Sequence, residues 1–277
     1  HTSFKIGGPA DILVLPESIE QLREVLKVVK ETVVPLTLLG NGSNVLVRDK
    51  GIRGIVIKLG NMLRHFYEAE DLLVFGSGYS LALASYKAME CGKTGMEFAV
   101  GIPGSIGGAV YMNAGAYDGE MQNIVNCVKV MDLQGNERVL TAEELNFGYR
   151  KTSLQNSGLI VTEVTLKMPS GNKDEIKSKM DDFSHRRISK QPLEMPSAGS
   201  MFKRPPGYFA GTLIDQAGLK GYTVGGAQIS TKHAGFVVNV GGATAADVLQ
   251  LIKDVQTKIK AGVGVELQPE VLVIGEE

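Results

Sequence analysis

Two glycine-rich segments set among apolar residues constrain the fold of this chain more than any other feature of its sequence. The longer one, GIPGSIGGAVYMNAGA, spans residues 101–116 and holds five glycines. A flexible linker of this glycine content is polar, whereas this segment also carries Ile106, Val110 and Met112. Glycine in an apolar segment permits a close approach of the backbone to a ligand or to other backbone. The pattern therefore predicts a packed segment whose main chain is in direct contact with a ligand or with other backbone.

The shorter segment, LLGNGSN at residues 38–44, follows an apolar run that is typical of a buried strand. Small residues directly after a strand let backbone N–H groups converge on an anion, without a lysine. The dinucleotide fingerprint G-x-G-x-x-G would need a glycine at Val45 and then a helix, but the residues that follow are patterned as strands. The sequence also lacks the G-x-x-x-x-G-K-[ST] motif, which argues against a P-loop. Taken alone, this segment is equally compatible with a plain tight turn.

Size and composition are those of a globular protein with a real core. The 277 residues (29.7 kDa, 43% hydrophobic, 21% charged) predict about two domains. A formal net charge of -1 gives no basic field for nucleic acid or an anionic membrane. We see neither a signal peptide nor an apolar run near the ~20 residues of a membrane helix. We therefore expect a cytoplasmic monomer without nucleic-acid or membrane partners, in which Cys91 and Cys127 are reduced packing residues.

Hydrophobic periodicity predicts helices and hairpins in an α+β arrangement rather than a regular βαβ alternation. An S-x-x-Q capping box at Ser18 and Gln21 opens a helix that ends before Pro35, and a hairpin turns at Gly135-Asn136. A long loop is expected at residues 192–207. Further helices are expected at residues 80–91, 173–190, 211–219 and 244–260. Strands are expected at residues 10–16, 35–40, 45–47, 54–59, 71–78, 159–168, 235–240 and 265–275.

Eight motifs follow one another along the chain: FKIGGPA, LGNGSNVLV, GIPGSIGGAVYMNAGAY, FGYR, AGSMFKRP, IDQAGLKG, HAGFVVN and QPEV. In residues and order they resemble the UDP-N-acetylenolpyruvoylglucosamine reductase family over essentially the whole chain. The resemblance implies an NADPH-dependent FAD enzyme that reduces the enolpyruvyl group of UDP-N-acetylglucosamine enolpyruvate, giving UDP-N-acetylmuramate for peptidoglycan synthesis. The short distance from Tyr149 to Ser200 indicates the subtype that lacks a tyrosine-bearing capping loop. Asp118 stands where a glycine is common in the family.

The resemblance also implies a vanillyl-alcohol-oxidase/PCMH-type FAD-binding fold in two subdomains, followed by a C-terminal α+β substrate domain. We expect the first subdomain at residues 1–60 and the second at residues 61–188 together with 268–277. These two would hold FAD between them, and residues 189–267 would cover the substrate.

The same resemblance assigns the FAD contacts to the two glycine segments. The cofactor-binding residues are Leu39, Gly40, Asn41, Gly42, Ser43, Asn44, Gly101, Ile102, Pro103, Gly104, Ser105, Gly107, Gly108, Ala109, Asn113 and Gly115. Neither segment contains a histidine or cysteine, the residues to which relatives of that fold attach FAD covalently, so we expect a non-covalent flavin.

Three residues match the family's catalytic set: Ser200 as proton donor, with Arg150 and Glu270 steadying the carboxyl region of the enolate. Tyr149, Lys190 and Arg204 match its substrate-binding positions. Without the resemblance, each of these would more often be an ordinary loop or surface residue.

His233 is expected to be structural, and the scattered histidines indicate no metal site. Two other functions stay open: a flavin oxidase with another small substrate, and a non-catalytic sugar-nucleotide or flavin-binding protein.

Overall fold

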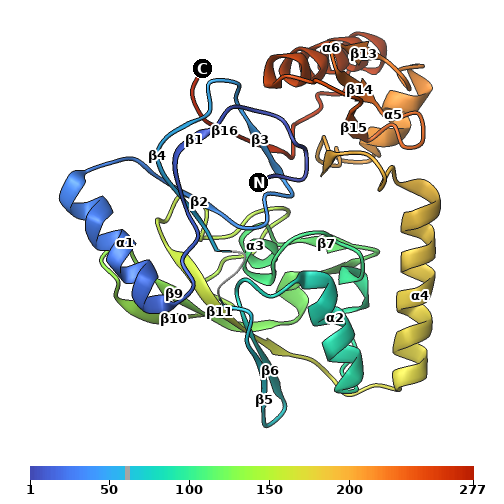
Figure 1. Cartoon of the computed structure of the whole chain (residues 1–277). Helices are drawn as coiled ribbons and strands as arrows, with labels where there is room; N and C mark the ends of the chain where they lie inside the picture. The colour runs from blue at the N-terminus through green and yellow to red at the C-terminus, as the bar shows by residue number, and fades with distance from the viewer. Residues whose placement is uncertain (60–62) are drawn as a thin grey trace. The chain divides into compact units, whose positions relative to one another are not determined.

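The structure, a computed structural model, describes residues 1–59 and 63–277. The chain divides into two compact units, whose elements are labelled in Figure 1. Unit 1 comprises residues 1–11, 42–53 and 188–277, and unit 2 comprises residues 12–41 and 54–187. Each contains helices and strands, so the predicted α+β class is confirmed. The expected three-part division into domains stays a prediction.

Unit 2 is built on a five-stranded antiparallel sheet in the order β10-β9-β11-β6-β5. Its strands are β5 (Phe66–Ala69), β6 (Leu72–Gly76), β9 (Val125–Met131), β10 (Glu137–Thr141) and β11 (Ile160–Lys167). The predicted hairpin is confirmed: Gly135 has φ +84, and its N–H donates to the carbonyl of Asp132 at 3.0 Å. Strand β5 was not predicted, because its two central residues are exposed and give no alternating apolar pattern.

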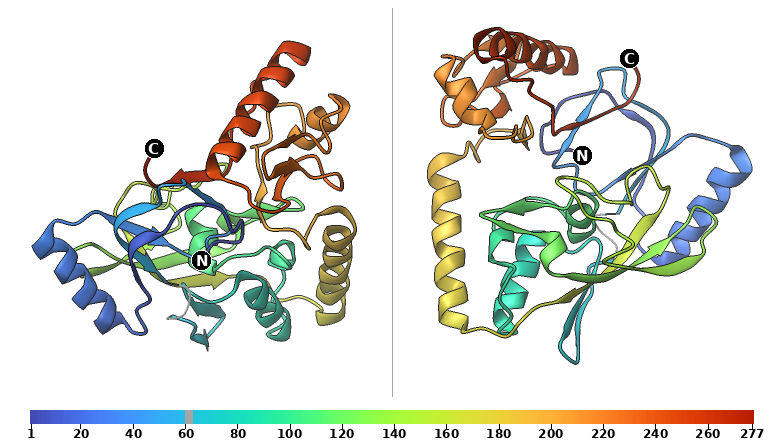
Figure 2. Two further views of the ribbon diagram at one scale, coloured as in Figure 1. Left: turned by 45° about the horizontal axis from the view of Figure 1, so that its top comes forward. Right: turned by 180° about the vertical axis from the view of Figure 1, so that it is seen from behind.

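Helices cover this sheet and fill the core of unit 2. The helix α2 (Leu81–Glu90) begins after its cap Ser80, close to the predicted boundary, and packs with α3 (Ile106–Tyr111) in one core with Phe75. The helix α4 (Lys173–Lys190) lies on the same side of unit 2 as α2 in both views of Figure 2. Shorter elements of unit 2 are β7 (Gly115–Ala116), β8 (Gly119–Glu120) and the 3-10 turns at Glu97–Ala99 and Met121–Asn123.

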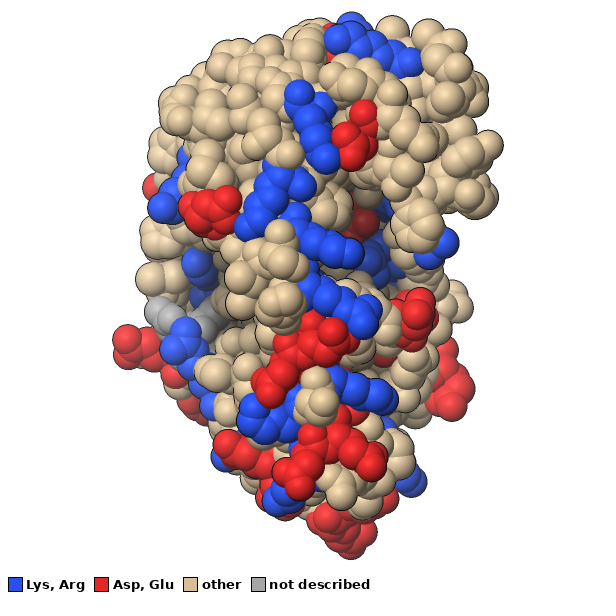
Figure 3. Space-filling model, turned by 90° about the vertical axis from the view of Figure 1, so that its right-hand side faces the viewer, with Lys and Arg blue, Asp and Glu red and all other residues tan. Residues whose placement is uncertain are grey.

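The outward face of α4 is charged, as its sequence predicts. Figure 3 looks onto this face and shows basic and acidic side chains interspersed along it. Lys177 pairs with Asp181 at 2.6 Å and Arg186 with Asp182 at 2.7 Å, both at the i,i+4 spacing that supports an exposed helix. The apolar side of α4 packs Ile176 onto the core of unit 2.

A smaller sheet, ordered β1-β4-β2, carries the first glycine segment. Its strands are β1 (Ala10–Val14), β2 (Leu36–Leu39) and β4 (Ile52–Lys58), of which β2 and β4 are parallel. The helix α1 (Ile19–Thr32) packs Leu22 and Leu26 in one core with Ile57 of β4. The hydroxyl of Ser18 caps α1 as predicted, but the Gln21 side chain accepts from the N–H of Glu17 rather than from Ser18.

Unit 1 combines a four-stranded sheet, ordered β12-β15-β14-β13, with two helices. The elements are β12 (Ser197–Ser200), α5 (Ala210–Gln216), β13 (Thr223–Val224), β14 (Ala227–Ile229), β15 (Phe236–Asn239) and α6 (Ala245–Val263). The strand β3 (Val45–Val47) pairs in parallel with β16 (Leu272–Ile274), so Leu46 joins the core formed by Val248 and Leu251 of α6. The predicted long loop at residues 192–207 therefore contains one strand, β12.

The start of α6 provides a stability test. Thr244 caps α6 by accepting from the N–H of Asp247 at 3.1 Å, and Asp247 accepts in return from the N–H of Thr244 at 2.9 Å. Replacing Thr244 by Ala should lower the stability of unit 1 by about 1 kcal/mol. Thr257→Ala is the control, since its hydroxyl only donates to the Lys253 carbonyl within the same helix. Urea unfolding monitored by circular dichroism should rank Thr244→Ala below both Thr257→Ala and the parent protein.

Candidate functional site

The first glycine segment leaves the carboxyl end of β2, beside the parallel strand β4. Ligands of parallel sheets bind at this edge. A Cβ built on Gly40 would have a single heavy atom of the described residues within 4 Å, the hydroxyl of Ser105 at 3.2 Å. The two glycine segments therefore meet at Ser105, and among residues 1–59 and 63–277 no other atom outside the neighbouring residues comes as close to that Cβ.

The second segment is partly helical, which its glycine content hid from sequence reasoning. Ser105, at the cap of α3, accepts from the N–H of Gly108 at 3.3 Å. Gly108 is exposed, whereas its helix neighbours Gly107 and Ala109 are buried. A Cβ on Gly108 would again have only Ser105 Oγ within 4 Å, at 3.4 Å. The main chain at Gly108 is therefore bare and accessible.

Other glycines of the second segment are packed against protein. A Cβ on Gly107 would lie 2.7 Å from the Cβ of Ser77, and one on Gly115 would lie 2.6 Å from the carbonyl oxygen of Gly119. Gly101 and Gly104 have φ +73 and +135, a backbone region that favours glycine. The structure gives these residues packing or turn roles, so their direct contact with a cofactor stays a prediction.

The remaining predicted cofactor residues lie in both units. Leu39, Gly40 and Asn41 belong to unit 2, whereas Gly42, Ser43 and Asn44 belong to unit 1. Gly42 has φ +67, and a Cβ there would lie 2.9 Å from the carbonyl oxygen of His1. Ile102 and Pro103 precede α3 in the turn that Gly101 opens.

Arg150 and Tyr149 lie against the end of the second glycine segment in unit 2. The Arg150 guanidinium donates to the carbonyls of Asn113 at 3.3 Å and Gly115 at 3.1 Å. It also lies over the ring of Tyr149, 5.1 Å from the centroid. Arg150 has φ +56, which is uncommon for a residue with a Cβ and marks a site that the surrounding fold constrains. The structure thus joins a predicted catalytic residue to the predicted cofactor segment.

Asn113 is used within the fold. Its side chain is fully buried, donates to Glu120 Oε2 at 3.1 Å and the Gly148 carbonyl at 3.0 Å, and accepts from the N–H of Gln122 at 3.0 Å. These contacts fix the turn that carries Arg150. Sequence reasoning assigned Asn113 to the cofactor instead, a role that stays a prediction.

Ser200 and Glu270 are brought together in unit 1. The N–H of Glu270 donates to the carbonyl of Met201, the residue after Ser200, at 2.9 Å. Ser200 ends β12 next to a register shift between β12 and β15, where Gly199 has φ +78. Such bulges redirect a side chain at the end of a strand. Sequence reasoning did not single out Gly199, although a glycine directly before the candidate serine was the available signal.

Asn44 of the first glycine segment also lies beside Glu270. Its side-chain amide donates to the Glu270 carbonyl at 3.2 Å, and its own carbonyl accepts from the N–H of Leu272 at 3.0 Å. A predicted cofactor residue thus fixes the backbone at and directly after a predicted catalytic residue.

The predicted substrate residues of unit 1 are cationic and lie outside its core. The Arg204 guanidinium stacks on Phe209, 4.0 Å from the ring centroid, and Lys190 is the exposed last residue of α4. Lys190 is near enough to His233 to contribute to the lowering of its pKa, for which burial is the larger cause. His233 Nδ1 accepts from the N–H of Gly235 at 3.0 Å, which agrees with a structural role.

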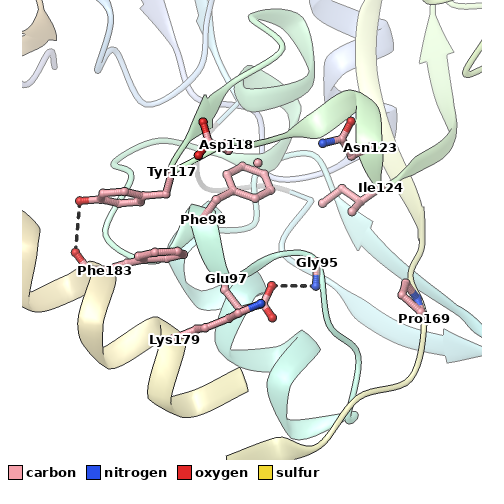
Figure 4. A pocket seen from close by; sticks show the side chains of 11 residues that line it. Gly95, Glu97, Phe98, Tyr117, Asp118, Asn123, Ile124, Pro169, Lys179 and Phe183 are labelled. Carbon is pink, nitrogen blue, oxygen red and sulfur yellow. Dashed lines mark hydrogen bonds between the residues drawn. The ribbon is translucent and has the colours of Figure 1, made fainter. Parts of the chain in front are cut away.

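Unit 2 has a hollow of about 380 Å³ that is lined by none of the predicted site residues. Figure 4 shows it between α4 and the turn at Tyr117 and Asp118, with the Tyr117 ring stacked on Phe183 at 4.3 Å. Both carboxylate oxygens of Glu97 are bonded there, one to the Thr94 hydroxyl and one to the N–H of Gly95. Asp118 has φ +63, the backbone region that favours the glycine common at this position in the family.

Cys91 and Cys127 are free thiols, and burial is the main cause that raises the pKa of Cys91 to about 11, so it stays protonated near neutral pH. Within residues 1–59 and 63–277, three or more His, Cys, Asp or Glu side chains nowhere gather as a metal site would require. The same residues include no helix of the length and apolar character needed to cross a bilayer.

Two family profiles match the chain. The FAD binding domain family matches residues 10–141, which confirms the expected FAD-binding fold. The family described as UDP-N-acetylenolpyruvoylglucosamine reductase, C-terminal domain, matches residues 191–274.

Individual relatives are similar over the full chain. A UDP-N-acetylenolpyruvoylglucosamine reductase of Clostridioides difficile (strain 630) is 50% identical over 100% of this chain and 91% of that protein. One of Clostridium perfringens (strain SM101) is 52% identical with the same coverage. The crystal structure of such a reductase from Thermus caldophilus has a TM-score of 0.84 and 40% identity, covering 98% of this chain and 95% of that one.

The environment of His233 leads to a prediction of how the stability of the fold depends on pH. The pKa of His233 is lowered in the fold, mainly by burial, so as the pH falls through 6.5 the unfolded chain takes up this proton first and the folded state loses stability. His233→Asn keeps an acceptor for the N–H of Gly235 but does not titrate. As the pH is lowered through 6.5, melting temperatures should fall less steeply for His233→Asn than for the parent protein. The exposed His185→Asn serves as control, and an unchanged slope in His233→Asn contradicts the assignment.

Proposed function

This chain belongs to the UDP-N-acetylenolpyruvoylglucosamine reductase family, and from that membership we propose which of its residues perform the reduction. Its enzyme class is that of an FAD-dependent oxidoreductase of peptidoglycan synthesis. The substrate is UDP-N-acetylglucosamine enolpyruvate, and NADPH is the hydride donor. When bound, FAD supplies the chemistry of taking a hydride from NADPH and delivering it to the enolpyruvyl methylene carbon.

The two glycine segments fit such a cofactor. A cradle for a ligand needs backbone that side chains leave uncovered, and in the part of the chain that the structure describes only Ser105 comes within 4 Å of a Cβ built on Gly40 or Gly108. We assign the FAD contacts first to these two glycines and to the capping hydroxyl of Ser105. The absence of His and Cys from both segments supports a non-covalent flavin.

We assign the stabilisation of the charge that develops on the substrate to Arg150 and Glu270. Hydride addition leaves negative charge on the carboxyl end of the former enolpyruvyl group, and a guanidinium suits it because it can bind a carboxylate through two N–H groups. Glu270 completes the pair that steadies this region, and its backbone is held by Asn44. Tyr149, Lys190 and Arg204 are assigned to binding the sugar nucleotide, the two cations to its phosphates.

We assign the donation of the proton that completes the reduction to Ser200. Its hydroxyl would donate to the carbon next to the one that receives the hydride, which gives the lactyl ether. The observation that carries this assignment is the bond from the Glu270 N–H to the Met201 carbonyl, because it keeps Ser200 and Glu270 in one place. The bulge at Gly199 supports it further by turning Ser200 at the end of β12.

We also propose that the enzyme works in the cytoplasm as a monomer that contacts neither nucleic acid nor membrane. A net charge of -1 supports this, since it creates no field that attracts polyanions. The division into FAD-binding parts at residues 1–60 and 61–188 with 268–277, and a substrate part at residues 189–267, remains part of the proposal.

Replacing Gly107 and Gly108 by alanine, one at a time, distinguishes a role in cofactor binding from a role in packing. In Gly108→Ala the apoprotein should fold normally, since alanine favours a helix, but the methyl group should weaken FAD binding at least about tenfold. In Gly107→Ala the methyl group meets Ser77, and the apoprotein should lose about 1–3 kcal/mol. Titration of apoprotein with FAD, followed by flavin fluorescence, and thermal melts measure the two effects. Unchanged FAD affinity in Gly108→Ala refutes the cradle.

Replacing Ser200 by Ala tests the proton donor. The variant should bind FAD and be bleached by NADPH like the parent protein, while turnover of the enolpyruvyl substrate falls by about 10²- to 10⁴-fold. Stopped-flow absorbance of the flavin follows each half-reaction separately. Ser178→Ala, on the exposed face of α4, is the control and should behave as the parent protein. If Ser200→Ala turns over normally, the proton comes from another group.

A further inference from the structure

The turn that carries Arg150 is fixed to the end of α3 by side-chain amides from two directions. Asn113 binds the carbonyl of Gly148, two residues before Arg150, at 3.0 Å. Gln155 binds the carbonyl of Arg150 itself at 3.1 Å and the carbonyl of Tyr111 at 3.2 Å. The backbone on both sides of Tyr149 is therefore tied to the second glycine segment.

Gln155 is built into this arrangement rather than directed at a ligand. Its amide nitrogen also lies 3.8 Å from the sulfur of Met112, so its neighbours are Arg150 and the last turn of α3. Thr152 adds a parallel bond from its hydroxyl to the same Tyr111 carbonyl at 2.9 Å. Two donors from one turn thus converge on the carbonyl that ends α3.

The conformation of Arg150 shows why such ties are needed. At φ +56 the residue occupies the left-handed region, which costs free energy when a Cβ is present and persists only where surrounding bonds impose it. Turning back to the usual region would move the Arg150 carbonyl away from Gln155 and the guanidinium away from the carbonyls of Asn113 and Gly115. The bonds to the Gly148 and Arg150 carbonyls therefore also set the direction of the guanidinium.

We propose that Gln155 is a positioning residue for Arg150, acting through the Arg150 carbonyl to keep the guanidinium against the second glycine segment. The proposal rests on the function proposed above, in which Arg150 stabilises the charge on the substrate. Asn113 is its counterpart from the other side, but it is fully buried and its loss would disturb the fold. Gln155 is partly exposed and is the better residue to replace.

The test compares Gln155→Met, Arg150→Met and the double variant, with Gln134→Met as a control in the exposed turn of the β9–β10 hairpin. Methionine matches the length of glutamine but cannot donate to the Arg150 carbonyl. A small misplacement of a charge-stabilising group costs up to about 100-fold in rate, so kcat should fall by about 10- to 100-fold in Gln155→Met with less change in KM. The double variant should be no slower than Arg150→Met, because Gln155 acts only through Arg150.

A second readout needs neither substrate nor flavin. Gly148 and Lys151 exchange backbone hydrogen bonds across the turn, at 2.9 and 3.1 Å. Hydrogen exchange of these amides in the apoprotein, measured by NMR, should be at least about tenfold faster in Gln155→Met and unchanged in Gln134→Met.

The outcomes separate the two proposals. Full activity in Arg150→Met overturns the proposed role of Arg150. Loss of activity in Arg150→Met with unchanged kcat and unchanged exchange in Gln155→Met overturns the positioning role alone. A double variant slower than Arg150→Met by the full effect of Gln155→Met also overturns it, since independent effects multiply.

Discussion

The hydroxyl of Ser105 is the point on which the arrangement of the predicted cofactor segments depends. It is nearly fully buried, it caps α3 through Gly108, and it is the nearest described atom to a Cβ built on Gly40. One small side chain therefore both caps a six-residue helix and lies next to the end of β2. A larger residue at this position would occupy the space that the two bare glycines leave open.

Side-chain amides hold the backbone of the two charged residues that are assigned to the carboxyl region of the enolate, Glu270 and Arg150. In unit 1 Asn44 binds the carbonyl of Glu270, and in unit 2 Gln155 binds the carbonyl of Arg150. Because the main chain is fixed in this way, the start of each charged side chain is held in place by backbone contacts. Amides suit this purpose because they donate hydrogen bonds and carry no net charge.

Sequence reasoning succeeded wherever one chain segment contains its own signal. The α1 pattern of Leu22 and Leu26, the hairpin turn at Gly135 and the helix that starts at about Thr244 are local, and each is found in the structure. It missed α3 and β12, since both are short and glycine-containing, and their structure comes from bonds to distant residues. The same holds for the candidate site. The motifs identified its residues, but they did not indicate which distant residues hold those residues by hydrogen bonds.

The sequence by itself determined the α+β class, the main helices and strands, and the family to which the glycine segments and the residues Arg150, Ser200 and Glu270 point. Tertiary structure alone decided which glycines are bare and which are packed. Gly107 and Gly108 are adjacent and chemically identical, yet one faces Ser77 and the other open space. The reason is that a glycine has no side chain whose polarity or size would indicate its environment in the sequence. That environment is formed by strands and turns that are distant in the chain.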